Sequence, residues 1–141
     1  MATNLIKKDL DVTVFNRSKE VVQQLVKEGA KTTETIQAAV ADADLVFSML
    51  STPEVVKSTF FGEEGVLSTM RQGALWVDCT TVNPSFSLEA SEAARQYGIS
   101  FVDAPVAGTK PHAEKAELAF FVGGKDEQVA FIRPLLEHMG N

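Results

Sequence analysis

Three polar residues stand directly after a strand-like run, and their types suit a phosphorylated ligand. Residues 12–15 are β-branched and aromatic, and Asn16, Arg17 and Ser18 follow them. In a dinucleotide-binding α/β unit, the end of the second strand meets the adenosine ribose, where an acidic residue binds a free 2′-hydroxyl. No acid stands here, and the planar guanidinium of Arg17 suits a phosphate. These residues favour NADP(H) over NAD(H). Taken alone, however, they are better explained by an ordinary strand-to-helix turn with Ser18 as N-cap and Arg17 solvated.

Small and polar residues also follow three other predicted strands, in residues 49–52, 79–83 and 103–108. Ligands of open parallel sheets lie beyond the carboxyl ends of the strands. We therefore expect the four strand ends to form a continuous binding groove along one rim of the sheet. Ordinary polar loops at strand ends are the alternative.

The alternation of strand and helix patterns predicts an α/β fold that is Rossmann-like, doubly wound and mostly parallel. Strands are expected at residues 11–16, 30–32, 45–50, 74–78, 100–104 and 118–122. Helices are expected to begin at Ser18, at Thr33 or Thr35, after Thr52 at Pro53, and after Asn83 at Pro84, with a last helix that restarts after a kink at Pro134. Residues 1–8 fit the tail of a helix, and residues 105–115 fit a loop.

Composition narrows the class of protein. Of the 141 residues, 45% are hydrophobic and 23% charged, which argues against disorder and against a membrane span and makes a cytoplasmic location the default. A net charge of −6 argues against nucleic-acid binding. Cys79, the single cysteine, can form no internal disulfide and has no companions for a metal site. An anionic cofactor would depend on local cations such as Arg17 and Lys19.

Several reactive side chains have a structural interpretation. Cys79 follows an apolar strand with no histidine near it in sequence, so we expect a buried, inert thiol rather than a nucleophile. His112 and His138 stand in no metal or triad pattern and are expected at the solvated surface. Asp78 and Asp103 end strands, where capping of loop amides is a simpler role than acid–base catalysis.

Five segments together resemble the cofactor domain of the β-hydroxyacid dehydrogenase family, which includes 3-hydroxyisobutyrate dehydrogenase, tartronate semialdehyde reductase and glyoxylate/succinic semialdehyde reductases. They are Met-Ala-Thr-Asn-Leu at 1–5, residues 12–18, Val-Asp-Cys-Thr-Thr at 77–81, Asp-Ala-Pro-Val-Ala-Gly at 103–108 and Phe-Val-Gly-Gly at 121–124. The Asp-Ala-Pro-Val-x-Gly segment is the most specific. The resemblance runs nearly the whole length and implies that residues 1–141 are a partial NAD(P)-binding Rossmann domain of the 6-phosphogluconate dehydrogenase type, with no second domain.

The resemblance also implies roles for individual residues. Asn16, Arg17 and Ser18 would hold the adenosine end of NADP, Met49 and Leu50 would line the groove through their backbones, Thr81 would reach the nicotinamide ribose, and Ala107, Gly108 and Thr109 would face the substrate acid. The family usually has Ser-Gly-Gly at this last position. A hydroxyl donor is therefore lost at Ala107, although Thr109 could supply one from a shifted position and the N–H of Gly108 remains. This difference leaves the substrate class open.

The implied reaction is hydride transfer between NADP(H) and a small 3-hydroxy acid or semialdehyde, which makes the parent protein an oxidoreductase. Two parts of the family's machinery have no counterpart: the glycine-rich phosphate turn, expected before Met1, and a catalytic lysine, expected after Asn141. We therefore expect no catalytic residue in this chain, no C-terminal all-α domain, and no activity of these residues alone. One alternative is a non-catalytic Rossmann-like module for interaction or oligomerisation. Another is a flavodoxin-like or receiver-type regulatory domain, which would need an acidic pocket or flavin-binding loops at the first strand.

The family's strand order has a structural consequence. In the order 3-2-1-4-5-6 the first strand is central, and this chain lacks it. The strands at 11–16 and 45–50 should then face each other across an unfilled slot, and unpaired strand edges associate readily. Our hypothesis is that upstream residues, a strand from elsewhere, or a second copy in a homo-oligomer fills the slot.

Overall fold

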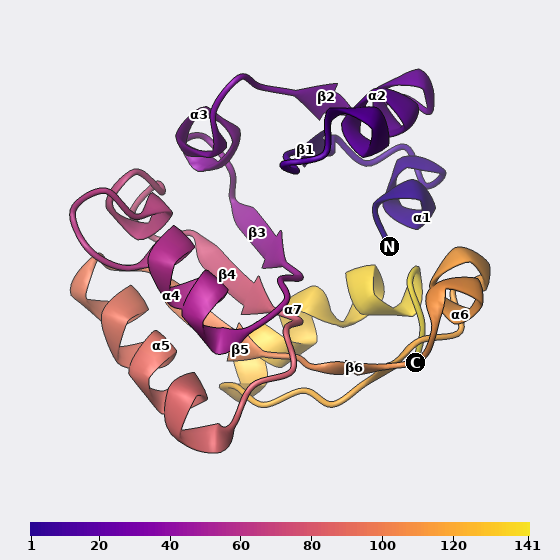
Figure 1. Ribbon diagram of the computed structural model, residues 1–141. Helices are drawn as coiled ribbons and strands as arrows, with labels where there is room; N and C mark the ends of the chain where they lie inside the picture. The colour runs from indigo at the N-terminus through magenta and orange to yellow at the C-terminus, as the bar shows by residue number, and fades with distance from the viewer.

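The computed structural model describes residues 1–141, in which helices and strands alternate along the chain (Figure 1). The helices are α1 (Ala2–Ile6), α2 (Lys19–Lys27), α3 (Ile36–Val40), α4 (Pro53–Phe60), the 3₁₀ helix η1 (Val66–Ser68), α5 (Pro84–Gln96), α6 (Lys110–Lys115) and α7 (Asp126–Glu137). The strands are β1 (Thr13–Val14), β2 (Lys31–Thr32), β3 (Leu45–Ser48), β4 (Leu75–Asp78), β5 (Ser100–Asp103), β6 (Val106–Ala107) and β7 (Ala119–Phe120).

The centre of the fold is the parallel sheet β3-β4-β5, in which Leu45, Leu75 and Ser100 are paired in register. Helices α4 and α5 cover one face of this sheet, and α7 covers the other (Figure 1). Burial on both faces explains why β3 and β4 read as nearly continuous apolar sequence. The predicted doubly wound α/β fold is confirmed.

Successive residues of β4 supply two separate cores, because neighbouring side chains in a strand point to opposite faces. Trp76 belongs to the core beneath α4 and α5, where it stacks on Phe60 with ring centroids 4.1 Å apart. Val77 belongs to the core beneath α7, together with Ile132 and Met139. The sheet is thus held from both sides by apolar packing.

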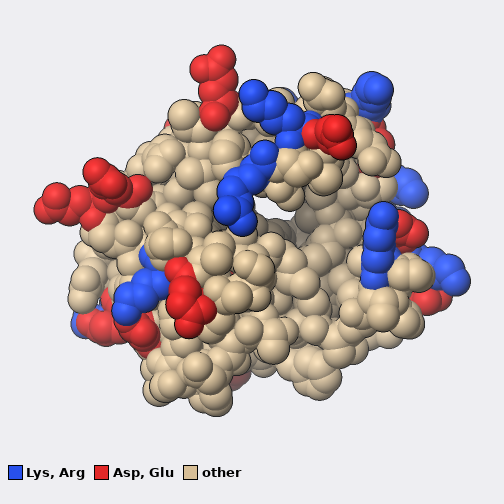
Figure 2. Space-filling view, viewed as in Figure 1, with Lys and Arg blue, Asp and Glu red and all other residues tan.

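The two N-terminal strands form a separate sheet. β1 pairs only with β2, in parallel, and neither strand is joined to β3. The expectation that the strands at 11–16 and 45–50 do not pair with each other is therefore confirmed. In the space-filling view an opening lies between the N-terminal part and the rest of the molecule, with basic side chains on its rim (Figure 2).

Helix starts follow the sequence closely. Ser18, Thr35, Thr52 and Asn83 are the N-caps of α2, α3, α4 and α5, and all but Ser18 accept a hydrogen bond from a backbone N–H of the first turn. The strands are shorter than predicted, most clearly β1. Its free edge has no neighbour to extend the ladder of hydrogen bonds.

Two predictions about the second half of the chain are wrong. Residues 105–115 are not simply a loop, because β6 pairs antiparallel with β7 and α6 follows. Helix α6 has six residues, too few to show an apolar periodicity in the sequence. Helix α7 also continues through Pro134 as one helix rather than restarting there.

Crossing a membrane requires a long, apolar helix, and none of the helices in this chain meets that requirement.

Candidate cofactor site

The structure brings three of the four polar strand ends together. Ser48, Asp78 and Asp103 end β3, β4 and β5 and are paired in register, so the loops that follow them leave the same edge of the sheet. The fourth end, at Asn16, follows β1 and therefore belongs to the separate two-stranded sheet.

The turn after β1 is built as a helix entry with an exposed cation. The N–H of Ser18 donates to Oδ1 of Asn16 at 3.0 Å, and Ser18 is the extended N-cap of α2. Arg17 is exposed and forms no ion pair. Ser18 therefore occupies the N-cap position without accepting a hydrogen bond from α2, and beside it the unpaired guanidinium of Arg17 is available to an anion.

A buried hydrogen-bond network lies under the ends of β3 and β4. Oδ1 of Asp78 accepts from the Ser48 hydroxyl at 2.8 Å and from the N–H of Thr80 at 3.1 Å. The Ser48 oxygen in turn accepts from Nε1 of Trp76 at 2.7 Å. The four residues of this network, Ser48, Trp76, Asp78 and Thr80, are all buried, and Asp78 is completely buried. The prediction that Asp78 caps a loop amide is confirmed.

Thr80 extends this network to the loop between β3 and α4. Its Oγ1 accepts a hydrogen bond from the N–H of Leu50 at 3.0 Å. The predicted groove residues Met49 and Thr81 are exposed beside these anchored positions. Sequence reasoning missed Ser48 and Thr80. The available signal was a hydroxyl residue placed at the end of each of two apolar runs.

Burial raises the pKa of both carboxyl groups at this edge. For Asp78, desolvation outweighs the hydrogen bonds from Thr80 and Ser48, which lower its pKa. For Asp103, desolvation and the nearby charge of Asp78 raise the pKa, while the Ser87 hydroxyl lowers it. Oδ1 of Asp103 is buried without a hydrogen-bond partner, and no backbone N–H donates to its carboxylate, so the expectation that Asp103 caps loop amides is wrong.

Cys79 follows Asp78 in the chain and is fully buried. Desolvation, with the negative charges of Asp78 and Asp103, raises its pKa to about 12. The thiolate that would act as a nucleophile is therefore strongly disfavoured at neutral pH. The prediction of a buried, inert thiol is confirmed.

The predicted substrate loop is exposed and shaped by glycine. Gly108 has a φ of +145°, and a Cβ there would lie 2.7 Å from Cδ2 of Leu118, so this position excludes a larger residue. Ala107, Gly108 and Thr109 all face solvent. The N–H of Gly108 remains the donor that the sequence analysis assigned to this loop.

His112 corrects the interpretation of this loop. Nδ1 of His112 accepts a hydrogen bond from the N–H of Thr109 at 3.0 Å and lies 2.7 Å from its Oγ1. His112 is thus exposed, as expected, but it helps to cap α6. The hydroxyl of Thr109 contacts His112 and is therefore not free to donate a hydrogen bond to a substrate in place of the hydroxyl missing at Ala107. His138 is also not fully solvated, since it is the partly buried C-cap of α7.

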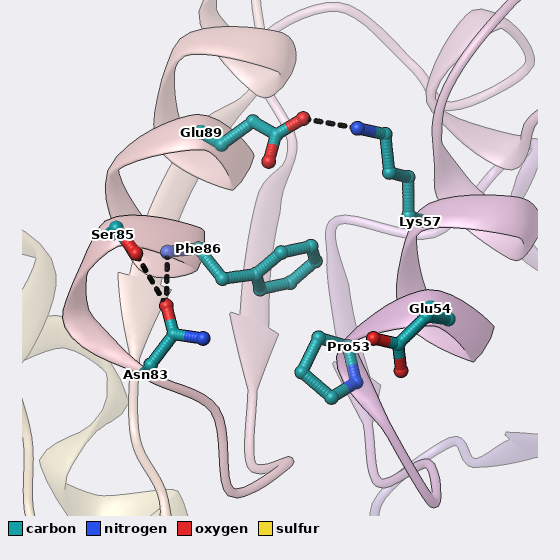
Figure 3. Close-up of a pocket in the computed structure, with 7 residues that line it drawn as sticks. All are labelled: Pro53, Glu54, Lys57, Asn83, Ser85, Phe86 and Glu89. Carbon is teal, nitrogen blue, oxygen red and sulfur yellow. Dashed lines mark hydrogen bonds and ion pairs between the residues drawn. The ribbon is translucent and has the colours of Figure 1, made fainter.

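A shallow pocket lies between the first turns of α4 and α5 (Figure 3). The ring of Phe86 points into it, and the ion pair of Lys57 with Glu89, 2.5 Å apart, spans one end. Glu54, in the first turn of α4, has its pKa lowered by hydrogen bonding to its own N–H and to Thr52. None of the predicted site residues lines this pocket.

Comparison with known proteins decides the family. The family model described as the NAD binding domain of 6-phosphogluconate dehydrogenase matches residues 1–141. The chain belongs to this family. The Rossmann-like cofactor-binding domain expected from the sequence is thereby confirmed. The aligned carboxyl ends of β3, β4 and β5 lie at the edge of the sheet where such domains bind their ligands.

Individual relatives match this NAD-binding domain over nearly its whole length. The 3-hydroxyisobutyrate dehydrogenase of Pseudomonas aeruginosa is 36% identical over 140 residues, covering 99% of this chain and 47% of that protein. The 3-hydroxyisobutyrate dehydrogenase of Mycobacterium tuberculosis, solved with L-serine, matches with a TM-score of 0.92 and 31% identity over 99% of this chain and 47% of its own. Psf3, in complex with NADP⁺ and 2-OPP, matches with a TM-score of 0.91 and 28% identity over 99% and 49%. The chain spans about half the length of the curated relatives it matches.

Proposed function

We propose that this NAD-binding domain binds NADP(H) and serves hydride transfer between the nicotinamide and a small 3-hydroxy acid or semialdehyde. The observation that carries the proposal is Arg17, an exposed guanidinium without an ion pair, between the neutral donors Asn16 and Ser18. No carboxylate stands in this turn to bind a free ribose 2′-hydroxyl or to repel a 2′-phosphate. Psf3 was solved with NADP⁺, whereas an L-serine dehydrogenase of Pseudomonas aeruginosa that is 36% identical to this chain is described as NAD-dependent, so the proposed preference rests on this turn.

The remaining proposed cofactor contacts lie on the β3–α4 and β4–α5 loops, which are joined through Leu50 and Thr80. In this proposal the backbone at Met49 and Leu50 lines the groove and Thr81 reaches the nicotinamide ribose. The exposure of Met49 and Thr81 on adjacent loops, joined through Leu50 and Thr80, supports this assignment. When bound, the cofactor supplies the hydride chemistry, and the chain's own residues bind and orient it.

The substrate would meet the loop of Ala107, Gly108 and Thr109. Ala107 offers no hydroxyl, and Thr109 is engaged with His112, so the N–H of Gly108 is the donor left for a carboxylate. We infer a substrate acid that is held here mainly by backbone donation. No residue of this chain is assigned the role of proton donor.

One observation favours a second function, that of an interaction or oligomerisation module. Strands β1 and β3 each have a neighbour on one edge only. Unpaired strand edges promote association. Light scattering over a range of protein concentrations would show whether the chain self-associates, and a monomer at all concentrations would argue against a homo-oligomer formed through these edges.

The proposed cofactor preference can be tested by titrating the protein with NADPH and with NADH and following the fluorescence of the cofactor. We expect NADPH to bind about tenfold more tightly, since one charge-assisted contact to phosphate contributes on the order of 1.5 kcal/mol. Arg17→Ala should abolish that preference, and Lys27→Ala, which removes an exposed cation at the other end of α2, is the matched control. Equal affinity for both cofactors would contradict the NADP assignment, and binding of neither would contradict the cofactor role.

A further inference from the structure

We propose that Asp78 is a positioning residue, whose buried carboxylate holds the β3–α4 loop and the β4–α5 loop in a fixed relation at the cofactor groove. The inference rests on the proposed function, because it assigns Met49, Leu50 and Thr81 to that groove. It gives roles to three residues to which the resemblance assigned none: Asp78 itself, Ser48 and Thr80.

The geometry gives Asp78 two attachments through one oxygen. Oδ1 accepts from the hydroxyl of Ser48, the last residue of β3, and from the N–H of Thr80 in the β4–α5 loop. Asp78 and Ser48 are also register partners in adjacent strands. One carboxylate oxygen therefore connects the end of the neighbouring strand to the loop that follows its own strand.

Thr80 converts this attachment into a link between the loops. The bond from its N–H to Asp78 turns the backbone so that Thr80 is 1% exposed and its Oγ1 can accept from the N–H of Leu50. The exposed Met49 is thus flanked by two held residues, Ser48 and Leu50. Thr81 is likewise adjacent to a held residue, Thr80.

The network also explains why an acceptor, rather than an apolar side chain, stands at position 78. An apolar residue would leave the Thr80 N–H and the Ser48 hydroxyl buried without this acceptor, which is costly. Asparagine keeps a carbonyl oxygen that can accept both bonds. Alanine keeps none. The pair Asp78→Asn and Asp78→Ala therefore separates loss of the acceptor from loss of the charge.

The decisive measurement is residue-specific hydrogen exchange by NMR on the protein without cofactor. In Asp78→Ala the Leu50 amide should exchange about tenfold faster relative to the core amide of Val77, the equivalent of one lost hydrogen bond. We call the exchange rate of the Leu50 amide divided by that of the Val77 amide the Leu50 ratio. In Asp78→Asn the Leu50 ratio should stay close to that of the native protein. A purely structural role would speed both amides together and leave their ratio unchanged.

The chain supplies a matched control and a built-in reporter. Asp103 is the register partner of Asp78 in β5, and Asp103→Asn should leave the Leu50 ratio unchanged. Trp76 is the only tryptophan, and its indole N–H donates to Ser48. Its indole proton resonance should move in Asp78→Ala more than in Asp103→Asn.

If Asp78→Ala does not fold, Thr80→Val tests the same link, because it removes only the oxygen that accepts from Leu50. An unchanged Leu50 ratio in Thr80→Val overturns the proposal. An NADPH titration of the same variants separates it from the proposed function. A fall in affinity of about tenfold in Thr80→Val supports both. Faster Leu50 exchange in a protein that binds no cofactor would refute the proposed function while the link between the loops stands.

Discussion

The sheet β3-β4-β5 and the pair β1-β2 are built from the same alternation of strands and helices, yet they differ sharply in burial. Every residue of β4 is buried, whereas no residue of β1, β2 or α2 is. The three-stranded sheet has helices on both faces and a central strand paired on both edges (Figure 1). The comparison teaches that an α/β unit obtains its core from its neighbours in the sheet more than from its own sequence pattern.

Exposed apolar side chains mark the same difference. Four of the eight large hydrophobic residues that remain exposed lie in residues 10–26: Leu10, Phe15, Val21 and Val26. Helix α2 is nonetheless amphipathic, with Val22 and Leu25 turned inward. The N-terminal part therefore has a suitable apolar face but too few neighbours to bury it.

The largest test of this contrast is truncation of one apolar side chain in each part. Trp76→Ala should lower the free energy of unfolding by about 3–5 kcal/mol, because it leaves a large cavity against Phe60. Val14→Ala, at the half-buried position of β1, should lower it by less than about 1 kcal/mol. Urea denaturation followed by circular dichroism measures both. Equal losses would show that the two parts are packed equally well.

Chemical labelling of thiols should separate the two parts next. Cys79, buried and with a pKa of about 12, should react with iodoacetamide at pH 8 at least about a hundredfold more slowly than an exposed thiol. The matched comparison is Thr13→Cys in a Cys79→Ala background, since Thr13 is exposed in β1. Mass spectrometry gives both rates. Rapid labelling of Cys79 would mean that the three-stranded sheet opens readily.

The smallest expected effect is a pH dependence that arises in the three-stranded sheet. Burial raises the pKa of Asp103 above its ordinary 3.8, so the folded state binds its proton more tightly than the unfolded state does. The contribution of Asp103 to stability is therefore greatest at low pH and falls as pH rises from about 3.8 through the raised pKa. Over this pH range Asp103→Asn should lose less stability than the native protein, because asparagine does not titrate. Denaturation midpoints from pH 3.5 upward test the sign, and a steeper loss in the variant would reverse it.

The sequence alone determined the features that depend on near neighbours. Apolar runs predicted β3, β4 and β5, and the residues Thr52-Pro53 and Asn83-Pro84 predicted the starts of α4 and α5. The family resemblance, with its known strand order, predicted the separation of β1 from β3. The roles of Asn16, Arg17, Ser18, Met49, Leu50 and Thr81 toward a cofactor remain predictions.

Only the tertiary structure decided which of these residues meet. Thr109 and His112 pair because α6 forms, and α6 is too short to leave a periodic signal. Ser48 and Asp78 meet across 30 residues because β3 and β4 are paired in register, and Thr80 reaches Leu50 for the same reason. Side-chain patterns specify local conformation and the face that is buried, whereas contacts between distant residues depend on how the strands align when the sheet forms.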